Sequence, residues 1–344
     1  MNSWEETLTG TILDRVARGM GLLSPHPKRP TRLALVLNPV SGRVATARGR
    51  RELVRELEDS RELHQRSFKL LYSRYPGHLR QSVYHLCREV WERGEALDIG
   101  SCGGDGTHAE VLESAEPWAE RGLSVRVVRW PMGTGNDASD APSIPALLER
   151  LRRGVQLEGV DALVVTTRRG AVRRAYNIAS IGVDAFITEL TNRLRHMVPG
   201  NIYKRVADVS VLFYEQLIGV GEMEVDYTGP RGSGILAGRF MLLAVGAGAP
   251  RTYGNHMQVL PDERNLCAIE RGHIGRKVVM KRRFYAGRHV RDGRTHMALA
   301  RSATVAYGKR VPAQLDGEAF WLSKEDFPVS FRVEAGLVKV LPRT

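Results

Sequence analysis

The stretch GGDGTHAEVL, residues 103–112, decides the fold expected for the N-terminal half of the chain. It follows ALDIGSC (96–102), a short apolar run typical of a buried strand, and it continues into a segment typical of a helix. Three of its first four residues are glycine, and glycine loses more backbone freedom on folding than any other residue type. Such a loop indicates a place where the backbone approaches a ligand closely or adopts positive φ angles.

Strands and helices alternate on both sides of this loop. Short apolar runs are followed by segments in which apolar residues recur at helical spacing. This alternation indicates a parallel sheet with helices on its faces, so the expected class of the N-terminal half is α/β. The predicted strands cover residues 32–38, 68–73, 96–102 and 124–131, and the predicted flanking helices cover 47–58, 78–94 and 144–154.

The pattern changes after residue 157. Short strands separated by Gly/Pro turns, as in 160–183 and 221–248, indicate an antiparallel β-rich domain, interrupted by one helical insert at 201–217. The predicted organisation is an N-terminal amphipathic extension (1–30), a parallel-sheet α/β domain (31–157) and an antiparallel β-sandwich domain (158–344).

The extension has one apolar stripe, because large apolar residues recur every four positions. This helix either packs on the body of the protein or lies on a membrane surface, and packing is the favoured reading. The stripe consists of Trp4, Leu8, Ile12, Val16 and Met20.

Composition narrows the class of protein. The 344 residues carry a net charge of +13, which favours an anionic partner such as a nucleotide, an anionic lipid or a nucleic acid, or reflects general arginine usage. No apolar run is long enough to cross a bilayer, and Glu5 and Glu6 do not suit a secretory signal, so we expect a cytoplasmic protein. The scattered Cys87, Cys102 and Cys267 argue against disulfides or a structural zinc.

Three loops rich in small residues follow predicted strands: NPVSGR (38–43), GGDGT (103–107) and PMGTGND (131–137). Ligands of open parallel sheets bind beyond the carboxyl ends of the strands, and backbone N–H groups in such loops can hold a polyphosphate. A tight turn explains any one of these loops, but three at successive strand ends favour the phosphate interpretation. The P-loop and Rossmann glycine patterns are both missing from the sequence.

The motifs resemble those of the bacterial diacylglycerol kinase and related lipid kinase family, which shares its catalytic fold with sphingosine kinases and, more distantly, with NAD kinases. The pair GGDGT and GTGND is specific, because an NAD kinase shares only the first and a sphingosine kinase usually ends the second differently. The matching stretches are LVLNPVSGR, YPGHL, CGGDGTHAEVL, PMGTGNDAS, NIASIGVDA and QLDGEAF, which occur in the family's order between residues 35 and 320.

This resemblance implies that the α/β domain binds ATP, and that ATP and the acceptor meet in a cleft completed by the β-rich domain. ATP and Mg²⁺ are the implied cofactors. The implied ATP-contacting residues are Asn38, Pro39, Ser41, Gly42, Ser73, Gly103, Gly104, Asp105, Gly106, Thr107, Gly133 and Thr134.

The catalytic residues implied by the resemblance are carboxylates. Glu318 is the expected general base on the acceptor hydroxyl, Asp316 is expected to assist it, and Asp105 is expected to act on nucleotide or magnesium geometry. Local structure offers alternatives, because Asp105 could form an Asx turn and Asp-Gly at 316–317 is a common hairpin turn. Asn136 and Asp137 are read as helix caps.

One stretch departs from the family. Members often carry an Asp-Asp-Gly linked to a magnesium site, whereas MQVLPDERNLCAIE (257–270) has Pro261, Asp262 and Glu263 but no Asp-Asp-Gly. No metal ligands are therefore assigned. The acceptor stays open between diacylglycerol and a related lipid alcohol such as a sphingoid base or ceramide.

The segment 276–294 has eight Lys/Arg and one acidic residue, which suits an anionic membrane surface or, equally, a solvated helix and loop. The leading hypothesis is an ATP- and Mg²⁺-dependent lipid kinase, peripheral on the cytoplasmic side of the membrane, with a homodimer left open. The alternatives are a nucleotide-binding regulator without turnover and, last, a basic nucleic-acid binder, which would leave the three loops unexplained.

Overall fold

The computed structural model describes residues 3–64, 66–75, 77–133, 140–194, 212–253 and 257–342. The chain divides into two compact units. Unit 1 comprises Met1–Val160 and Ala335–Thr344, and unit 2 comprises Asp161–Glu334. This division differs from the predicted domains, because residues 335–344 belong to unit 1 and the predicted extension is part of the same unit.

Unit 1 is built on a six-stranded sheet with the order β2-β1-β3-β4-β20-β5. The pairs from β2 to β20 are parallel, and β5 is antiparallel to β20. Strand β3 is buried along its whole length, which explains why most of its residues are apolar or small. The strands are β1 (Thr31–Leu37), β2 (Lys69–Tyr72), β3 (Ala96–Gly103), β4 (Val125–Pro131), β5 (Glu158–Gly159) and β20 (Lys339–Val340).

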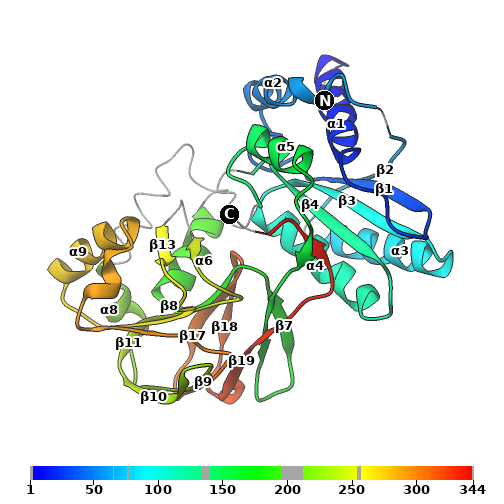
Figure 1. Cartoon of the computed structure of the whole chain (residues 1–344). Helices are drawn as coiled ribbons and strands as arrows, with labels where there is room; N and C mark the ends of the chain where they lie inside the picture. The colour runs from blue at the N-terminus through cyan, green and yellow to red at the C-terminus, as the bar shows by residue number, and fades with distance from the viewer. Residues whose placement is uncertain are drawn as a thin grey trace. The chain divides into compact units, whose positions relative to one another are not determined.

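Among the described residues, helices α1, α2 and α5 lie on one face of this sheet and α3 and α4 lie on the other (Figure 1). Helix α1 packs into the core, because Ile12, Val16 and Met20 are fully buried with Trp130 of β4. The extension is therefore part of the α/β unit rather than a separate piece. The helices are α1 (Ser3–Met20), α2 (Ala47–Glu56), α3 (His78–Glu92), α4 (Asp105–Ala119) and α5 (Ile144–Arg152).

The C-terminal segment is part of unit 1 and is hydrogen-bonded to α4. The buried carboxylate of Glu116 accepts hydrogen bonds from the backbone N–H groups of Leu337 (2.7 Å) and Val338 (3.3 Å). These bonds place β20 beside β4, where Lys339 pairs with Arg126. The sequence prediction assigned this segment to the β-rich domain because it reads locally as one more strand.

Unit 2 contains two six-stranded antiparallel sheets, with orders β10-β9-β16-β19-β6-β7 and β15-β14-β11-β8-β17-β18. Apolar side chains from both sheets form one core, so the predicted class, an α/β domain followed by an antiparallel β domain, is confirmed. The first sheet comprises β6 (Ala162–Thr166), β7 (Val172–Ala175), β9 (Met223–Gly229), β10 (Gly232–Gly238), β16 (Ser302–Tyr307) and β19 (Val329–Glu334). The second comprises β8 (Ile178–Gly182), β11 (Phe240–Gly246), β14 (Leu266–Glu270), β15 (Thr295–Ala298), β17 (Val311–Leu315) and β18 (Glu318–Leu322).

Helices cover the outer face of the second sheet. That face presents Ile178, Leu242 and Cys267 to a second apolar cluster, which includes residues of the surrounding helices. Residues 201–211 of the predicted helical insert (201–217) lie outside the described residues. The end of the predicted insert overlaps α8. The elements here are α6 (Val183–Leu194), α8 (Tyr214–Ile218), α9 (Ile274–Tyr285), a short 3-10 helix η2 (Arg288–Arg291) and the hairpin β12 (Arg251–Tyr253) and β13 (Met257–Leu260).

In the part of the chain that the structure describes, no helix combines the length and the apolar character needed to cross a bilayer.

Candidate functional site

The first two glycine-containing loops, and the third as far as Gly133, lie at one edge of the unit 1 sheet. Strands β1, β3 and β4 are neighbours, and their register pairs Leu37 with Cys102 and Gly103 with Pro131, so the strands end at the same level. Parallel pairing of adjacent strands therefore brings the loops together, as the sequence predicted.

Asn38 joins the first loop to the second. Its backbone N–H donates to Cys102 O (3.2 Å), and its side-chain Nδ2 donates to Thr107 Oγ1 (3.2 Å). Its Oδ1 accepts from the N–H of Val40 (3.2 Å), which folds the loop back in an Asx turn that includes Pro39. A single amide side chain thus holds two loops in register.

Gly42 joins the first loop to the third. It has a φ of +44°, and a Cβ there would lie 2.5 Å from the carbonyl carbon of Gly133. The next N–H, of Arg43, donates to Met132 O (3.0 Å). Two backbones therefore pass so closely that only glycine fits.

The glycines of the second loop differ in what a Cβ at each position would contact. A Cβ on Gly103 would lie 2.5 Å from Thr107 Oγ1, so this glycine makes room inside the protein. A Cβ on Gly104 would lie 3.3 Å from Ser41 Oγ, and one on Gly106 would meet none of the described residues within 4 Å. Packing among the described residues therefore does not require glycine at position 106.

The start of α4 has no side-chain cap. Thr46 and Ser143 cap α2 and α5 with side-chain oxygens that accept backbone N–H groups, whereas α3 and α4 begin at Gly77 and Gly104, which have no side chain to do so. N–H groups at such a helix start, together with the positive end of the helix dipole, suit an anion. Asp105, half-buried, is the first residue of the helix.

Of the two further residues predicted to contact ATP, Ser73 and Thr134, the structure describes only Ser73. Ser73 follows β2, and its N–H donates to Leu37 O (2.9 Å), so it lies beside the first loop. Thr134 lies outside the described residues, as do Asn136 and Asp137.

Two residues, one on either side of the third loop in the sequence, form a buried ion pair. Arg129 of β4 donates from Nε to Asp140 Oδ1 (2.6 Å), and both side chains are almost fully buried. Beneath the second loop, Ser101 Oγ is 2.8 Å from His108 Nδ1. Burial and the nearby Arg129 charge lower the pKa of His108 to about 3, so this histidine is neutral and supports the loops by packing.

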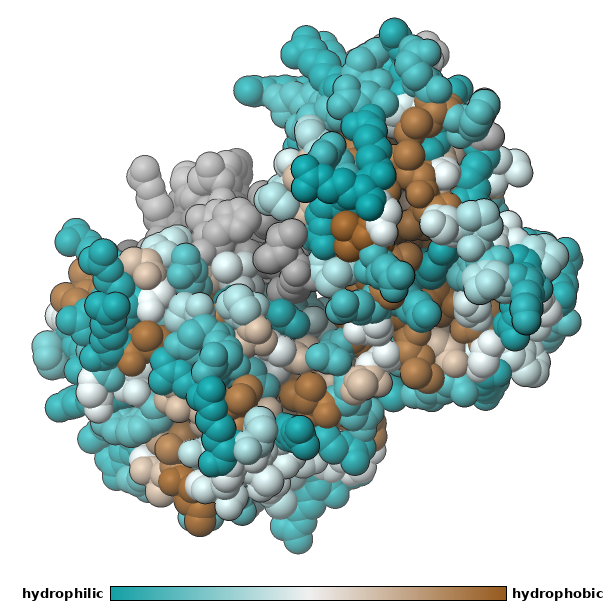
Figure 2. Space-filling view, viewed as in Figure 1, coloured by the Kyte–Doolittle hydropathy of each residue, from teal (hydrophilic) through white to brown (hydrophobic). Residues whose placement is uncertain are grey.

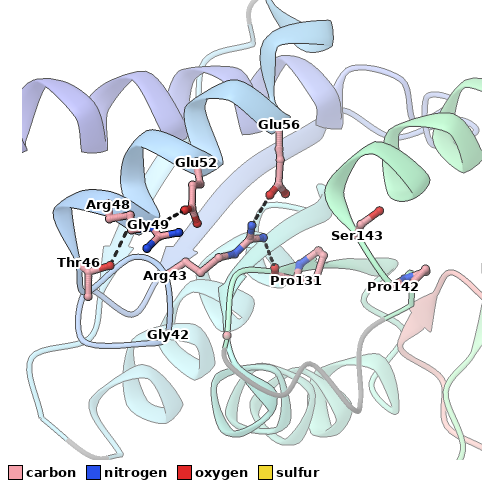
Figure 3. A pocket seen from close by; sticks show the side chains of 11 residues that line it. Gly42, Arg43, Thr46, Arg48, Gly49, Glu52, Glu56, Pro131, Pro142 and Ser143 are labelled. Atoms are coloured by element: carbon pink, nitrogen blue, oxygen red, sulfur yellow. Dashed lines mark hydrogen bonds and ion pairs between the residues drawn. The ribbon is translucent and has the colours of Figure 1, made fainter. Parts of the chain in front are cut away.

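A cavity of about 480 Å³ lies between the starts of α2 and α5 (Figure 3). It borders the loop junction, since Gly42 and Gly133 are among its lining residues. Its arginines are already neutralised, because Arg43 pairs with Glu56 and Arg48 pairs with Glu52. The cavity is therefore a polar hollow beside the loops rather than a strong anion site.

The second group of predicted residues lies in a hairpin turn of unit 2. Asp316 and Gly317 have φ angles of +48° and +93°, which forms the tight turn between β17 and β18 and pairs Leu315 with Glu318. Glu318 is exposed and is the first residue of β18.

The carboxylate of Asp316 accepts three backbone N–H groups. Oδ2 accepts from Tyr176 (2.6 Å), and Oδ1 accepts from Asn177 (3.0 Å) and Ile178 (2.9 Å). These bonds hold the turn against the start of β8, so Asp316 positions the turn that carries Glu318. Its direct participation in catalysis stays a prediction.

Asp184, which the sequence analysis did not assign, is connected to the same turn. Gln314 accepts from the N–H of Gly317 (2.9 Å) and donates to Ser180 Oγ (3.0 Å) and Asp184 Oδ2 (3.2 Å). Ser180 also donates to Asp184 Oδ2 (2.7 Å). Burial of the carboxyl group raises the pKa of Asp184 to about 6. The only sequence signal was its place in the stretch NIASIGVDA.

Two neighbouring acidic residues in the stretch that lacks Asp-Asp-Gly pair with arginines. Asp262 and Glu263 pair with Arg264 and Arg231, and the bond from Arg264 lowers the pKa of Asp262. Across the described ranges, no three His, Cys, Asp or Glu side chains are grouped so that they could hold a metal ion.

Comparisons with known proteins agree with this arrangement. Residues 32–165 match the family model of the diacylglycerol kinase catalytic domain. Three solved structures from Bacillus anthracis strain Sterne are similar: a diacylglycerol kinase (13% identity, TM-score 0.55) and two candidate diacylglycerol kinases (both 15% identity, TM-scores 0.59 and 0.60). The alignments cover 92% of this chain and 98 or 99% of each of the others, which shows a shared fold. A search of curated proteins gave no match.

The loop junction predicts a contrast between two glycines. Gly42→Ala should destabilise the protein by about 2 kcal/mol or more, because it adds a Cβ at positive φ against the Gly133 backbone. Gly106→Ala should leave the free energy of unfolding unchanged or raise it by less than about 1 kcal/mol. Urea denaturation of the two variants tests this, and equal stability would contradict the packing at the junction.

The half-buried Asp184 predicts a pH dependence. Its folded pKa, about 6, lies above the ordinary 3.8, so the neutral carboxyl group favours folding at low pH and this contribution is lost as pH rises through about 6. Asp184→Asn should therefore gain stability relative to wild type, on the order of 2 kcal/mol, between about pH 4 and about pH 8. Urea denaturation at both pH values measures the gain. The exposed control Asp226→Asn should show none, and a pH-independent difference for Asp184→Asn would refute the assignment.

Proposed function

We propose, from the match of residues 32–165 to the family model of the diacylglycerol kinase catalytic domain, that the protein is a kinase that transfers the γ-phosphate of ATP to the hydroxyl group of diacylglycerol or a related lipid alcohol. The observation that carries the proposal is the convergence of three loops on the start of α4, a helix without a side-chain cap. Phosphoryl transfer depends mainly on such positioning and on stabilisation of phosphate charge.

The loops are suited to the phosphate groups of the nucleotide. Backbone N–H groups at the start of α4 would bind phosphate oxygens, and the hydroxyl group of Ser41 lies beside Gly104 there. The buried hydroxyl group of Thr107 bonds to Asn38 and supports the loop from inside. Gly106 supports this reading, because none of the described residues lies within 4 Å of a Cβ built at that position. A phosphate group would lie there.

Magnesium would accompany ATP, and when bound it neutralises charge on the β- and γ-phosphates. The half-buried Asp105 at the start of α4 is the carboxylate suited to hold it, since Mg²⁺ is commonly held by one or two carboxylates together with phosphate oxygens. Asp262 and Glu263 are unsuited, because arginines already neutralise them.

Glu318 would act as the general base. It would accept the proton of the acceptor hydroxyl while that oxygen forms a bond to the γ-phosphorus, the bond to the bridging oxygen breaks, and ADP leaves. Asp316 would position Glu318, because its three hydrogen bonds fix the turn. Asp184 is the second carboxylate connected to this turn, through Gln314.

A nucleotide-binding regulator without turnover is the second candidate. The pairing of Asp262 and Glu263 with arginines favours it, because the family resemblance leads us to expect an Asp-Asp-Gly linked to magnesium in this stretch, and the chain has none there. The proposed location for either function is the cytoplasmic side of the membrane.

The proposed activity predicts a transferable phosphate and an essential base. With Mg²⁺ and γ-labelled ATP, the protein should label one of diacylglycerol, a sphingoid base or ceramide presented in detergent micelles. Glu318→Gln should lower kcat on the order of 100-fold or more with little change in the KM for ATP, because the proton acceptor is lost while the loops remain.

Glu224→Gln is the matched control, since Glu224 is also an exposed glutamate on a strand of unit 2. It should retain wild-type turnover. ATP binding without any labelled lipid would favour the regulator, and full activity of Glu318→Gln would assign the base to another carboxylate, with Asp184 tested next.

A further inference from the structure

Helix α9 exposes apolar side chains instead of burying them. Ile274, Val278, Val279 and Tyr285 are 44%, 47%, 48% and 43% exposed. Residues 274, 278 and 285 fall on one side of the helix, because spacings of four and eleven residues return to nearly the same direction. An apolar stripe that faces solvent is unusual, since surface helices turn their apolar side inward.

On the inward side of α9, cationic side chains bind the helix to the rest of unit 2 through hydrogen bonds and ion pairs. Lys277 is buried, donates to Leu212 O (3.0 Å) and pairs with Glu215 (3.3 Å). Arg276 and Arg283 both pair with Asp292. These contacts fix which face of the helix remains outside.

The outward cations have no such partners. Arg271, Arg282, Arg288 and Arg291 are exposed, and none forms an ion pair within the described ranges. The one acidic residue between 271 and 294 is Asp292, which the inward arginines already occupy. The exposed side of this region therefore combines apolar groups with uncompensated positive charge.

Helix α8 extends the apolar surface. It lies beside α9, as the pairing of Glu215 with Lys277 shows, and it contributes Phe213 at its cap and Leu217, which are 47% and 63% exposed. Hydrophobic residues appear among hydrophilic ones at the end of unit 2 where Figure 1 labels α8 and α9 (Figure 2). The surface comprises Phe213, Leu217, Ile274, Val278, Val279, Arg282, Tyr285 and Arg288, and we call it the α8–α9 surface.

We infer that the α8–α9 surface binds an anionic lipid bilayer. Apolar side chains flanked by arginines are the features of a helix that lies in the membrane interface, with the apolar groups at the acyl boundary and the cations at the phosphates. A nucleic acid would use the arginines but would leave this apolar stripe in water.

This inference deepens the proposed function. Helix α9 packs on the outer face of the sheet that includes β17 and β18, whose turn carries Glu318. A lipid acceptor lies in a bilayer, so a membrane-binding surface on the same unit would bring the proposed base to its substrate. The binding itself needs neither ATP nor turnover and can be measured separately.

Vesicle sedimentation without ATP tests the inference. Wild type should bind phosphatidylcholine vesicles containing phosphatidylglycerol and should bind pure phosphatidylcholine vesicles weakly. Arg282→Gln with Arg288→Gln should weaken binding on the order of 25-fold, about fivefold for each charge. Val278→Ser with Tyr285→Ser should weaken it about tenfold, because less apolar surface is buried.

The matched control is Ile235→Ser with Lys309→Gln, a pair of exposed residues on and beside the other sheet of unit 2. It should bind vesicles as wild type does, and thermal unfolding should show that all variants are folded. Wild-type binding by both α9 variants, or no preference for anionic vesicles, would overturn the inference. Binding to duplex DNA but not to vesicles, lost in the arginine variant, would also overturn it.

Kinase assays in detergent micelles separate the two proposals. Both α9 variants should keep wild-type turnover on micellar lipid, because the α8–α9 surface is not part of the phosphate or base machinery. Vesicle binding without phosphate transfer would contradict the kinase and leave the membrane surface supported. Phosphate transfer without vesicle binding would support the kinase and contradict the membrane-binding surface.

Discussion

The contact between the first and third loops is the constraint on which the candidate site of unit 1 depends. Gly42 lies against the backbone of Gly133, and Asn38 bonds to Thr107, so three chain segments from distant parts of the sequence meet at the start of α4. The strand order makes this meeting feasible, because β1, β3 and β4 are adjacent and parallel. A side chain at position 42 would separate the loops and with them the N–H groups proposed to hold phosphate.

Unit 2 uses its carboxylates in distinct ways. Asp316 is held by three backbone N–H groups and fixes a turn, whereas Glu318, two residues later, is exposed. Asp184 is connected to this turn through Gln314, and burial raises its pKa to about 6. Three carboxyl groups near one turn therefore differ in role. Asp316 positions the backbone, Asp184 has a raised pKa and, by our proposal, Glu318 accepts a proton.

Local patterns were enough to predict the parallel sheet and the loops at its carboxyl edge, because apolar runs and glycine clusters are local signals. They could not show that residues 335–344 return to unit 1, since β20 is two residues long and its position depends on Glu116. Nor could they show the three bonds to Asp316 or the network around Asp184. Those depend on residues more than a hundred positions apart in the sequence, which only the folded chain brings together.

The central claim is that backbone N–H groups of the converging loops hold the phosphates of ATP. Hydrogen exchange measured by mass spectrometry, with and without Mg²⁺ and ATP, tests it most directly. The account predicts slower exchange in peptides covering 38–43 and 103–108, and loss of this protection in Gly106→Val, whose side chain would fill the space at the start of α4. ATP binding that leaves exchange in both loops unchanged, or equal protection in Gly106→Val, would contradict it.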